Sequence, residues 1–115
     1  MAAETTFPSA IKLQGYLEKQ SYYLKLFRKR WIVLRKMDDN LYCYKTKDMK
    51  DVTEIINLTE FKLITTNRAD KFTLIHREGE DRNRVFRAMD KSMLNAWMTT
   101  IVKQSITQIF HTKAI

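Results

Sequence analysis

Glycine, proline and cysteine are scarce in this chain of 115 residues, which contains two glycines, one proline and one cysteine. Long flexible linkers and glycine-punctuated repeats are therefore not expected. Because Cys43 is alone, an internal disulfide and a cysteine-rich zinc site are excluded, which predicts a reducing, intracellular compartment. Long apolar runs are also missing, so we expect neither a signal peptide nor a transmembrane span.

Catalytic and metal-binding groups are equally few. The two histidines, His76 and His111, lie far apart, and neither has a companion at metal-ligand spacing. The sequence has no glycine-rich phosphate loop, no paired-carboxylate arrangement and no nucleophile beside a credible base. Cys43 lies in an aromatic segment and is interpreted as a packing residue. These absences predict a binding domain without enzymatic activity, cofactor or metal.

The residues that are present indicate one folded domain with an uneven charge. Hydrophobic residues make up 44% and charged residues 30%, a balance typical of globular proteins. The net charge is +8. Seven basic residues and no acidic residue lie in one segment: Lys19, Lys25, Arg28, Lys29, Arg30, Arg35 and Lys36. Such a segment is typical of a site for a polyanion, either a phospholipid headgroup or a nucleic acid, and equally of a solvated strand edge.

The order of the expected elements predicts a mainly β fold. Residues 1–10 are polar and aperiodic, and we expect them to form a flexible arm. Segments rich in β-branched and aromatic residues then predict seven strands. These strands span residues 13–20, 27–36, 41–46, 53–58, 61–66, 71–77 and 83–89.

The last segment changes its period. Asp90 is a candidate N-cap, and apolar residues recur after it at spacings of three and four. They are Met93, Leu94, Trp97, Met98, Ile101 and Val102. This predicts an amphipathic helix, continued by Ile106, Ile109 and Phe110 as far as His111. Seven strands followed by one helix predict a partly open barrel or sandwich that the helix caps at one end.

The order of several short motifs resembles the pleckstrin-homology (PH) domain family over roughly residues 13–104. The motifs are GYLEK at 15–19, RKRWIVL at 28–34, LYCY at 41–44, FRA at 86–88 and the single helix tryptophan, Trp97. The resemblance implies that residues 11–104 form a PH domain, with Trp97 plugging one end of the barrel. Residues 105–115 would be a helical extension and tail.

The subset of this family that binds inositol phosphates has a lysine at the end of strand one, a variable loop, and the pattern basic, any, arginine, any, apolar. Lys19, the loop 20–27 and residues 28–32 match this pattern. The resemblance implies binding of phosphoinositides, favouring 3-phosphorylated lipids such as phosphatidylinositol 3,4,5-trisphosphate. It also implies a cytoplasmic protein that is recruited to the inner face of the plasma membrane or to endomembranes.

Two features depart from that pattern. Phosphoinositide-binding relatives often carry a tyrosine in strand three where this chain has Cys43. Lys45, on the same strand face, or else Lys47 or Lys50 in the next loop, is expected to substitute for it. The acidic turn 78–81 is expected at the rim of the same opening, where it would repel phosphates. Arg82 and Arg84 would partly offset that repulsion.

Strand alternation supports the site independently of the family. Arg28 and Arg30 share a strand face with Ile32, and Lys19 shares a face with Leu17. If the apolar members face the interior, the three cations converge where the barrel opens. The planar fork of arginine and the compact charge of lysine both suit phosphate. The sequence therefore predicts a headgroup site composed of Lys19, Arg28, Arg30 and Lys45.

The loop between the first two strands predicts membrane contact. Tyr23 and Leu24 place an aromatic and an aliphatic side chain beside cations, as an interfacial anchor requires. Lys25 and Lys29 would add attraction to an anionic surface. Phe27 is expected to pack back onto the barrel.

An alternative function remains open at this stage. PH-like domains also bind proteins, with weak or non-specific binding of anionic lipids. Ile106, Ile109 and Phe110 would then dock a protein partner or a second copy of the chain. Binding of nucleic acid is not expected, because the sequence has no helix-turn-helix or RNP-type motif.

Overall fold

The computed structural model describes residues 10–21, 24–65, 70–79, 82–104 and 109–111. The strands are β1 (Ile11–Gln20), β2 (Phe27–Arg35), β3 (Asn40–Tyr44), β4 (Val52–Asn57), β5 (Phe61–Thr65), β6 (Lys71–His76), β7 (Arg84–Arg87) and β8 (Ile109–His111). A 3-10 turn, η3 (Leu58–Glu60), joins β4 to β5, and one helix, α1 (Lys91–Gln104), follows β7. No helix in this part of the chain is long and apolar enough to cross a bilayer.

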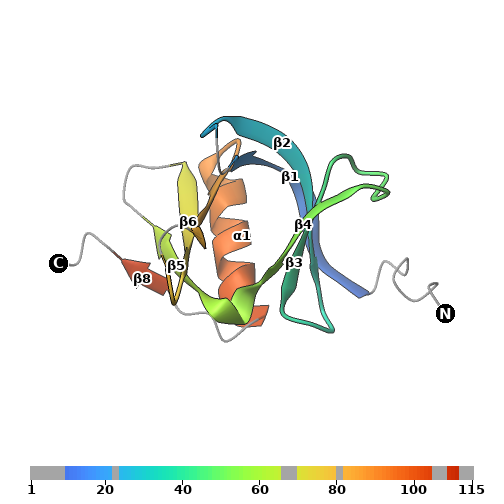
Figure 1. Ribbon diagram of the computed structural model, residues 1–115. Coiled ribbons are helices and arrows are strands. Elements are labelled where there is room, and N and C mark those ends of the chain that lie inside the picture. Colours follow the sequence, from blue (N-terminus) through green and yellow to red (C-terminus); the bar gives the residue numbers. More distant parts are fainter. Residues whose placement is uncertain (1–9, 22–23, 66–69, 80–81, 105–108, 112–115) are drawn as a thin grey trace.

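All eight strands belong to one curled sheet, in the order β4-β3-β2-β1-β7-β6-β5-β8 (Figure 1). Strands β1 to β7 pair antiparallel, and β8 pairs parallel to β5. The sheet does not close, because β4 and β8 lie at its two edges. The predicted fold, seven strands in a partly open barrel with one helix after them, is confirmed.

Alternation along the strands decides which side chains enter the core. Leu17 of β1 and both Ile32 and Leu34 of β2 are buried, so the face predicted to point inward does so. Phe72 and Phe86, on neighbouring strands, stack with ring centroids 5.2 Å apart and fill the middle of the barrel. Lys19, Arg28 and Arg30 follow the same alternation and lie at the hairpin end of β1 and β2.

Helix α1 begins where the sequence predicts it. The Asp90 carboxylate Oδ1 accepts a hydrogen bond from the Met93 backbone N–H at 2.8 Å, which satisfies one of the otherwise unpaired N–H groups of the first turn. Leu94, Trp97 and Ile101, spaced by three and four residues, are buried in the core cluster. In Figure 1 the helix lies between the β3–β4 side and the β5–β6 side of the sheet, as expected of a cap.

The C-terminal segment differs from the prediction. Helix α1 ends at Gln104, and Ile109–His111 form β8 beside β5, so the helical continuation to His111 is wrong. Two physical reasons favour a strand here. β-Branched residues are frequent in this segment, and β5 would otherwise leave a row of unpaired backbone groups at the sheet edge. Ile106 and residues 1–9 of the predicted arm 1–10 lie outside the described residues.

Candidate functional site

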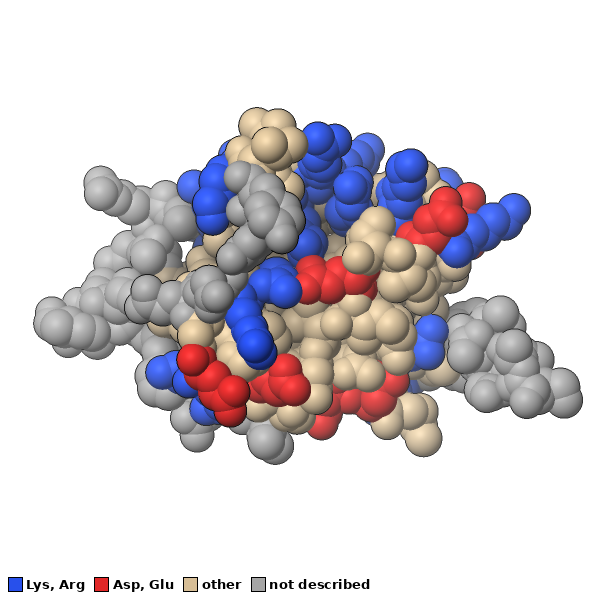
Figure 2. Space-filling view, in the orientation of Figure 1, with Lys and Arg blue, Asp and Glu red and all other residues tan. Residues whose placement is uncertain are grey.

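The β1–β2 hairpin brings the predicted cations together. In its register Lys19 lies opposite Arg28, and Leu17 lies opposite Arg30. The Lys19 side chain is only 16% exposed, Arg30 is half-buried and Arg28 is exposed. Figure 2 shows lysine and arginine side chains gathered along the upper edge of the molecule, over the β1–β2 hairpin and the β3–β4 loop. The cations therefore lie at one end of the sheet.

The carboxylate of Glu54, on edge strand β4, contacts two cations at this end of the sheet. Glu54 of β4 contacts Lys19 with 2.8 Å between Nζ and Oε1, and it accepts a hydrogen bond from Arg84 Nε to Oε2 at 2.6 Å. The side chains of Glu54 and Arg84 are each 23% exposed. Because the two oxygens contact different cations, Glu54 joins β4 to both β1 and β7. Charges with this little solvent contact are screened less than surface charges.

Cys43 lies beneath these charges. In the sheet register it is opposite Ile32 on one side and Glu54 on the other. Burial raises the pKa of the Cys43 thiol to about 12, and the charges of four residues around it modify this pKa further. These four residues, which we call the charged cluster, are Lys19, Glu54, Arg84 and Arg30. Cys43 thus forms the floor of the cluster, and its interpretation as a packing residue agrees with its burial.

The buried thiol provides a test of this floor. A pKa of about 12 against the ordinary 9.0 lowers the thiolate fraction of Cys43 by roughly a thousandfold near neutral pH. We therefore expect Ellman's reagent to react with the native protein at pH 8 at least 100-fold more slowly than with protein unfolded in guanidinium, an order-of-magnitude figure. Rapid labelling of the native state would contradict the burial.

The same pKa shift has a defined effect on stability. The folded state holds the thiol proton more tightly than the unfolded state, so the stabilisation from Cys43 is complete below the ordinary pKa of the thiol. It is lost as the pH rises from about 9 towards about 12. The measurement is the free energy of unfolding from denaturant titrations at several pH values between about 9 and 12. As the pH rises, this free energy should fall less in Cys43→Ala than in wild type, because the variant has no thiol to titrate.

The remaining predicted headgroup residues differ in their placement. Within the described residues, Arg28, Arg30 and Lys45 form no ion pair with a carboxylate. The Arg30 guanidinium donates a hydrogen bond through Nη1 to the Lys29 carbonyl at 2.9 Å. Lys45 is exposed just beyond the end of β3, after an irregularity between Cys43 and Tyr44. No described contact joins Lys45 to the charged cluster.

The β1–β2 loop exposes apolar side chains beside the cations. Leu24 is 63% exposed and Leu26 is 52% exposed, while Tyr23 lies outside the described residues. Lys25 is exposed and adopts a positive φ of 57° at the turn. Phe27 is half-buried, with the Arg87 guanidinium 4.0 Å from its ring centroid, as expected for a residue that packs back onto the barrel.

Lys29 lies on the outer face of the sheet, away from the charged cluster. Its Nζ is 4.5 Å from the ring centroid of Tyr16, on the neighbouring strand β1. Tyr16 in turn makes an edge contact with Trp31, with centroids 4.8 Å apart. Lys29 therefore lies on the opposite face of the hairpin from Lys19 and Arg30, in agreement with the predicted alternation.

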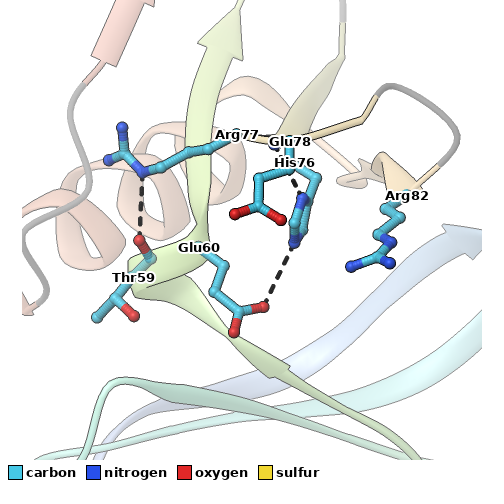
Figure 3. A pocket seen from close by; sticks show the side chains of 6 residues that line it. All are labelled: Thr59, Glu60, His76, Arg77, Glu78 and Arg82. Carbon is cyan, nitrogen blue, oxygen red and sulfur yellow. Dashed lines mark hydrogen bonds and ion pairs between the residues drawn. The ribbon is translucent and has the colours of Figure 1, made fainter.

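A cavity of about 230 Å³, which we call the η3 cavity, lies between η3 and the end of β6 (Figure 3). Its walls include buried His76, whose Nδ1 accepts a hydrogen bond from the Glu78 N–H and whose Nε2 lies 3.4 Å from a Glu60 oxygen. Arg77 donates to the Thr59 carbonyl at 3.2 Å across the cavity. The cavity is lined by two carboxylates and two guanidinium groups, those of Glu60, Glu78, Arg77 and Arg82. This balance gives it no preference for an anion, unlike the charged cluster.

Sequence reasoning missed two members of the charged cluster. From the sequence, Arg84 is expected only as an offset to the acidic turn, and Glu54 is not predicted as a site residue. A pattern could have identified both residues. Glu54 precedes buried Ile56 by two positions, and Arg84 precedes buried Phe86 by two, so each shares an inward strand face with a core residue. A charged residue on an inward face needs a partner of opposite charge.

Comparisons with known proteins identify the family and support the fold. The model of the PH domain family matches residues 11–105. The C-terminal PH domain of pleckstrin, solved in complex with D-myo-Ins(1,2,3,4,5)P5, has 23% identity and a TM-score of 0.71, covering 83% of this chain and 98% of its own. The Slm1 PH domain in complex with inositol-4-phosphate has 25% identity and a TM-score of 0.70, covering 84% and 97%.

A third similar structure is the PH domain of human pleckstrin homology domain-containing protein family A member 5. It has 27% identity and a TM-score of 0.70, covering 89% of this chain and 83% of its own. Among curated proteins no match is found. The family match spans strands β1 to β7 and helix α1.

Proposed function

Since the chain belongs to the PH domain family, we propose that it is a binding module for phosphoinositide headgroups and that it attaches its protein to the cytoplasmic face of a membrane. The observation that carries the proposal is the β1–β2 register. It places Lys19 opposite Arg28, with Arg30 two residues further along β2. The Slm1 PH domain, a structural neighbour at 25% identity, is solved with inositol-4-phosphate, which supports the class of ligand and not the position of the site.

The roles of the three cations follow from their exposure. Arg28 is exposed and has no carboxylate partner among the described residues, so it is available for the first contact with a phosphate. Arg30 is half-buried and held by the Lys29 carbonyl, so its planar guanidinium is oriented for paired hydrogen bonds. Lys19 lies deeper and adds a compact charge.

The exposed apolar loop orients the domain on a membrane. Leu24 and Leu26 project from the loop that joins the strands of Lys19 and Arg28. A headgroup held by these strands places both leucines at the lipid surface, where their burial adds to the affinity. Exposed Lys25, beside them, adds attraction to anionic lipids. We also propose that Tyr23, in the same loop, contacts the lipid. From the resemblance to inositol-phosphate-binding PH domains, we propose that the domain prefers 3-phosphorylated lipids.

Sedimentation with vesicles tests this function. Vesicles of phosphatidylcholine that contain phosphatidylinositol 3,4,5-trisphosphate are compared with control vesicles of phosphatidylcholine. In the control, phosphatidylserine supplies the same net charge. We expect at least tenfold tighter binding to the phosphoinositide, because its clustered phosphates form several charge-assisted hydrogen bonds at once.

Equal binding to both vesicle types, lost at moderate salt, would identify a non-specific basic surface and overturn the proposal. Absence of binding to either type would favour the protein-partner alternative. Light scattering of the same sample then shows whether the partner is a second copy of the chain.

A further inference from the structure

We propose that Glu54 is a built-in competitor for the headgroup site: its carboxylate occupies the position of a phosphate between Lys19 and Arg84, and binding of a headgroup displaces it. The inference rests on the proposed function and adds a residue that sets its selectivity. Glu54 lies on edge strand β4, 35 residues after Lys19 and 30 residues before Arg84, so its position depends on the curl of the whole sheet.

The contacts of Glu54 match those that a phosphate would make. Its two oxygens take separate cations, Lys19 Nζ at 2.8 Å and Arg84 Nε at 2.6 Å. Lysine and arginine donate to carboxylate and phosphate oxygens with the same geometry and range of distances. A phosphate group that approached Lys19 would therefore compete for the same N–H donors. It would also meet the negative charge of Glu54 a few ångströms away.

The position of the cluster makes this competition effective. The Lys19, Glu54 and Arg84 side chains are between 16% and 23% exposed, so water screens their interaction only partly. Arg28 and Arg30 have no carboxylate partner in the described part of the chain. The site thus has two halves, an open one on β2 and one that Glu54 neutralises.

This division predicts selectivity between headgroups. One phosphate can bind Arg28 and Arg30 and leave the Lys19–Glu54 contact intact. A headgroup with several phosphates reaches further, and its larger charge outcompetes the single carboxylate for Lys19. Glu54 therefore weakens the binding of singly phosphorylated lipids more than that of polyphosphorylated lipids, and so acts as a threshold on phosphate number.

The variant Glu54→Gln tests the threshold, because it removes the charge and keeps the shape and one oxygen acceptor. Two probes are used: vesicles containing phosphatidylinositol 4-phosphate and vesicles containing phosphatidylinositol 3,4,5-trisphosphate. We expect the variant to bind the monophosphate vesicles about tenfold more tightly than wild type, the change that one charged contact makes. Its affinity for the trisphosphate vesicles should rise less. The ratio of the affinity for the trisphosphate lipid to that for the monophosphate lipid should therefore be lower in the variant than in wild type.

Glu18→Gln is the matched control. Glu18 is also a strand carboxylate with an arginine partner, Arg87, at 2.7 Å, but it pairs with that residue on the outer face of the hairpin. The two variants change the net charge equally. A gain in Glu18→Gln that equals the gain in Glu54→Gln would show a general charge effect and overturn the inference. The double variant Glu54→Gln/Lys19→Ala should lose most of the gain, because the freed lysine is then absent.

The outcomes separate the inference from the function on which it rests. If wild type binds phosphoinositides through Arg30 and Glu54→Gln binds both lipids with unchanged affinity, only the inference fails. If neither protein prefers phosphoinositides over charge-matched phosphatidylserine, the proposed function fails as well. Circular dichroism checks that the variant is folded. If Glu54→Gln unfolds at the assay temperature, Glu54→Thr, which suits an edge strand, replaces it in the same comparison.

Discussion

Replacing Arg30 by alanine is expected to weaken binding to phosphoinositide vesicles by about 10- to 100-fold. Hydrogen bonds to a charged partner contribute about 1.5–3 kcal/mol each, which corresponds to this range. Arg30 is suited to such bonds because it is half-buried and its guanidinium is oriented by the Lys29 carbonyl. The measurement is the dissociation constant from vesicle sedimentation at fixed salt.

Arg77→Ala is the control for Arg30→Ala. Arg77 is an exposed arginine that contacts the Thr59 carbonyl at the η3 cavity, so its loss changes the net charge equally without touching the hairpin. Arg77→Ala should reduce the affinity for phosphoinositide vesicles less than twofold, because an exposed charge outside the binding site contributes little to the interaction. Similar losses in both variants would mean that the domain binds through its overall charge. Arg30→Lys should fall between Arg30→Ala and wild type, because it keeps the charge and loses the planar fork.

Replacing Trp97 by alanine is expected to cost about 3–5 kcal/mol of unfolding free energy. Trp97 is buried in the core cluster, and its removal leaves a cavity where α1 meets the sheet. Domains of this size have only about 5–15 kcal/mol of stability in total. The midpoint of thermal unfolding, followed by circular dichroism, should fall by about 10 to 25 °C.

Met89→Ala serves as the reference for Trp97→Ala. Met89 precedes the same helix and is 79% exposed, so its truncation should change the unfolding free energy by no more than about 0.5 kcal/mol. A small effect of Trp97→Ala as well would mean that the helix contributes little to the core. Loss of vesicle binding at a temperature where Trp97→Ala remains folded would indicate that the helix also positions the headgroup site.

The parts of the fold that depend on local pattern could be predicted from the sequence. Period-two alternation identified the inward faces of β1 and β2, and with them the neighbourhood of Lys19, Arg28 and Arg30. The helix start followed from Asp90 and the apolar spacing after it. Each of these features is decided by residues within one element or one hairpin, so the sequence contains the necessary information within a short window.

The features that depend on distant elements could not be predicted in the same way. Glu54 meets Arg84 across 30 residues because the sheet curls until its edge strand β4 approaches β7. Strand β8 forms because β5 offers an unpaired edge, which outweighs the helical pattern of the preceding segment. The register shift after Cys43 interrupts the alternation from which the position of Lys45 was inferred. In each case a tertiary contact overrides a local preference.

The open sheet has a consequence for the response of the domain to ionic strength. Added salt screens the attraction between the cations and an anionic membrane, and this lowers the affinity. The contacts of Glu54 with Lys19 and Arg84 are partly buried, so salt screens them less, and they keep the edge strand attached to the rest of the sheet. Lys19 and Arg84 therefore stay neutralised by Glu54 while the exposed cations lose their attraction to lipid. Because fewer cations respond to salt, the affinity should fall less steeply than the number of basic residues alone would suggest.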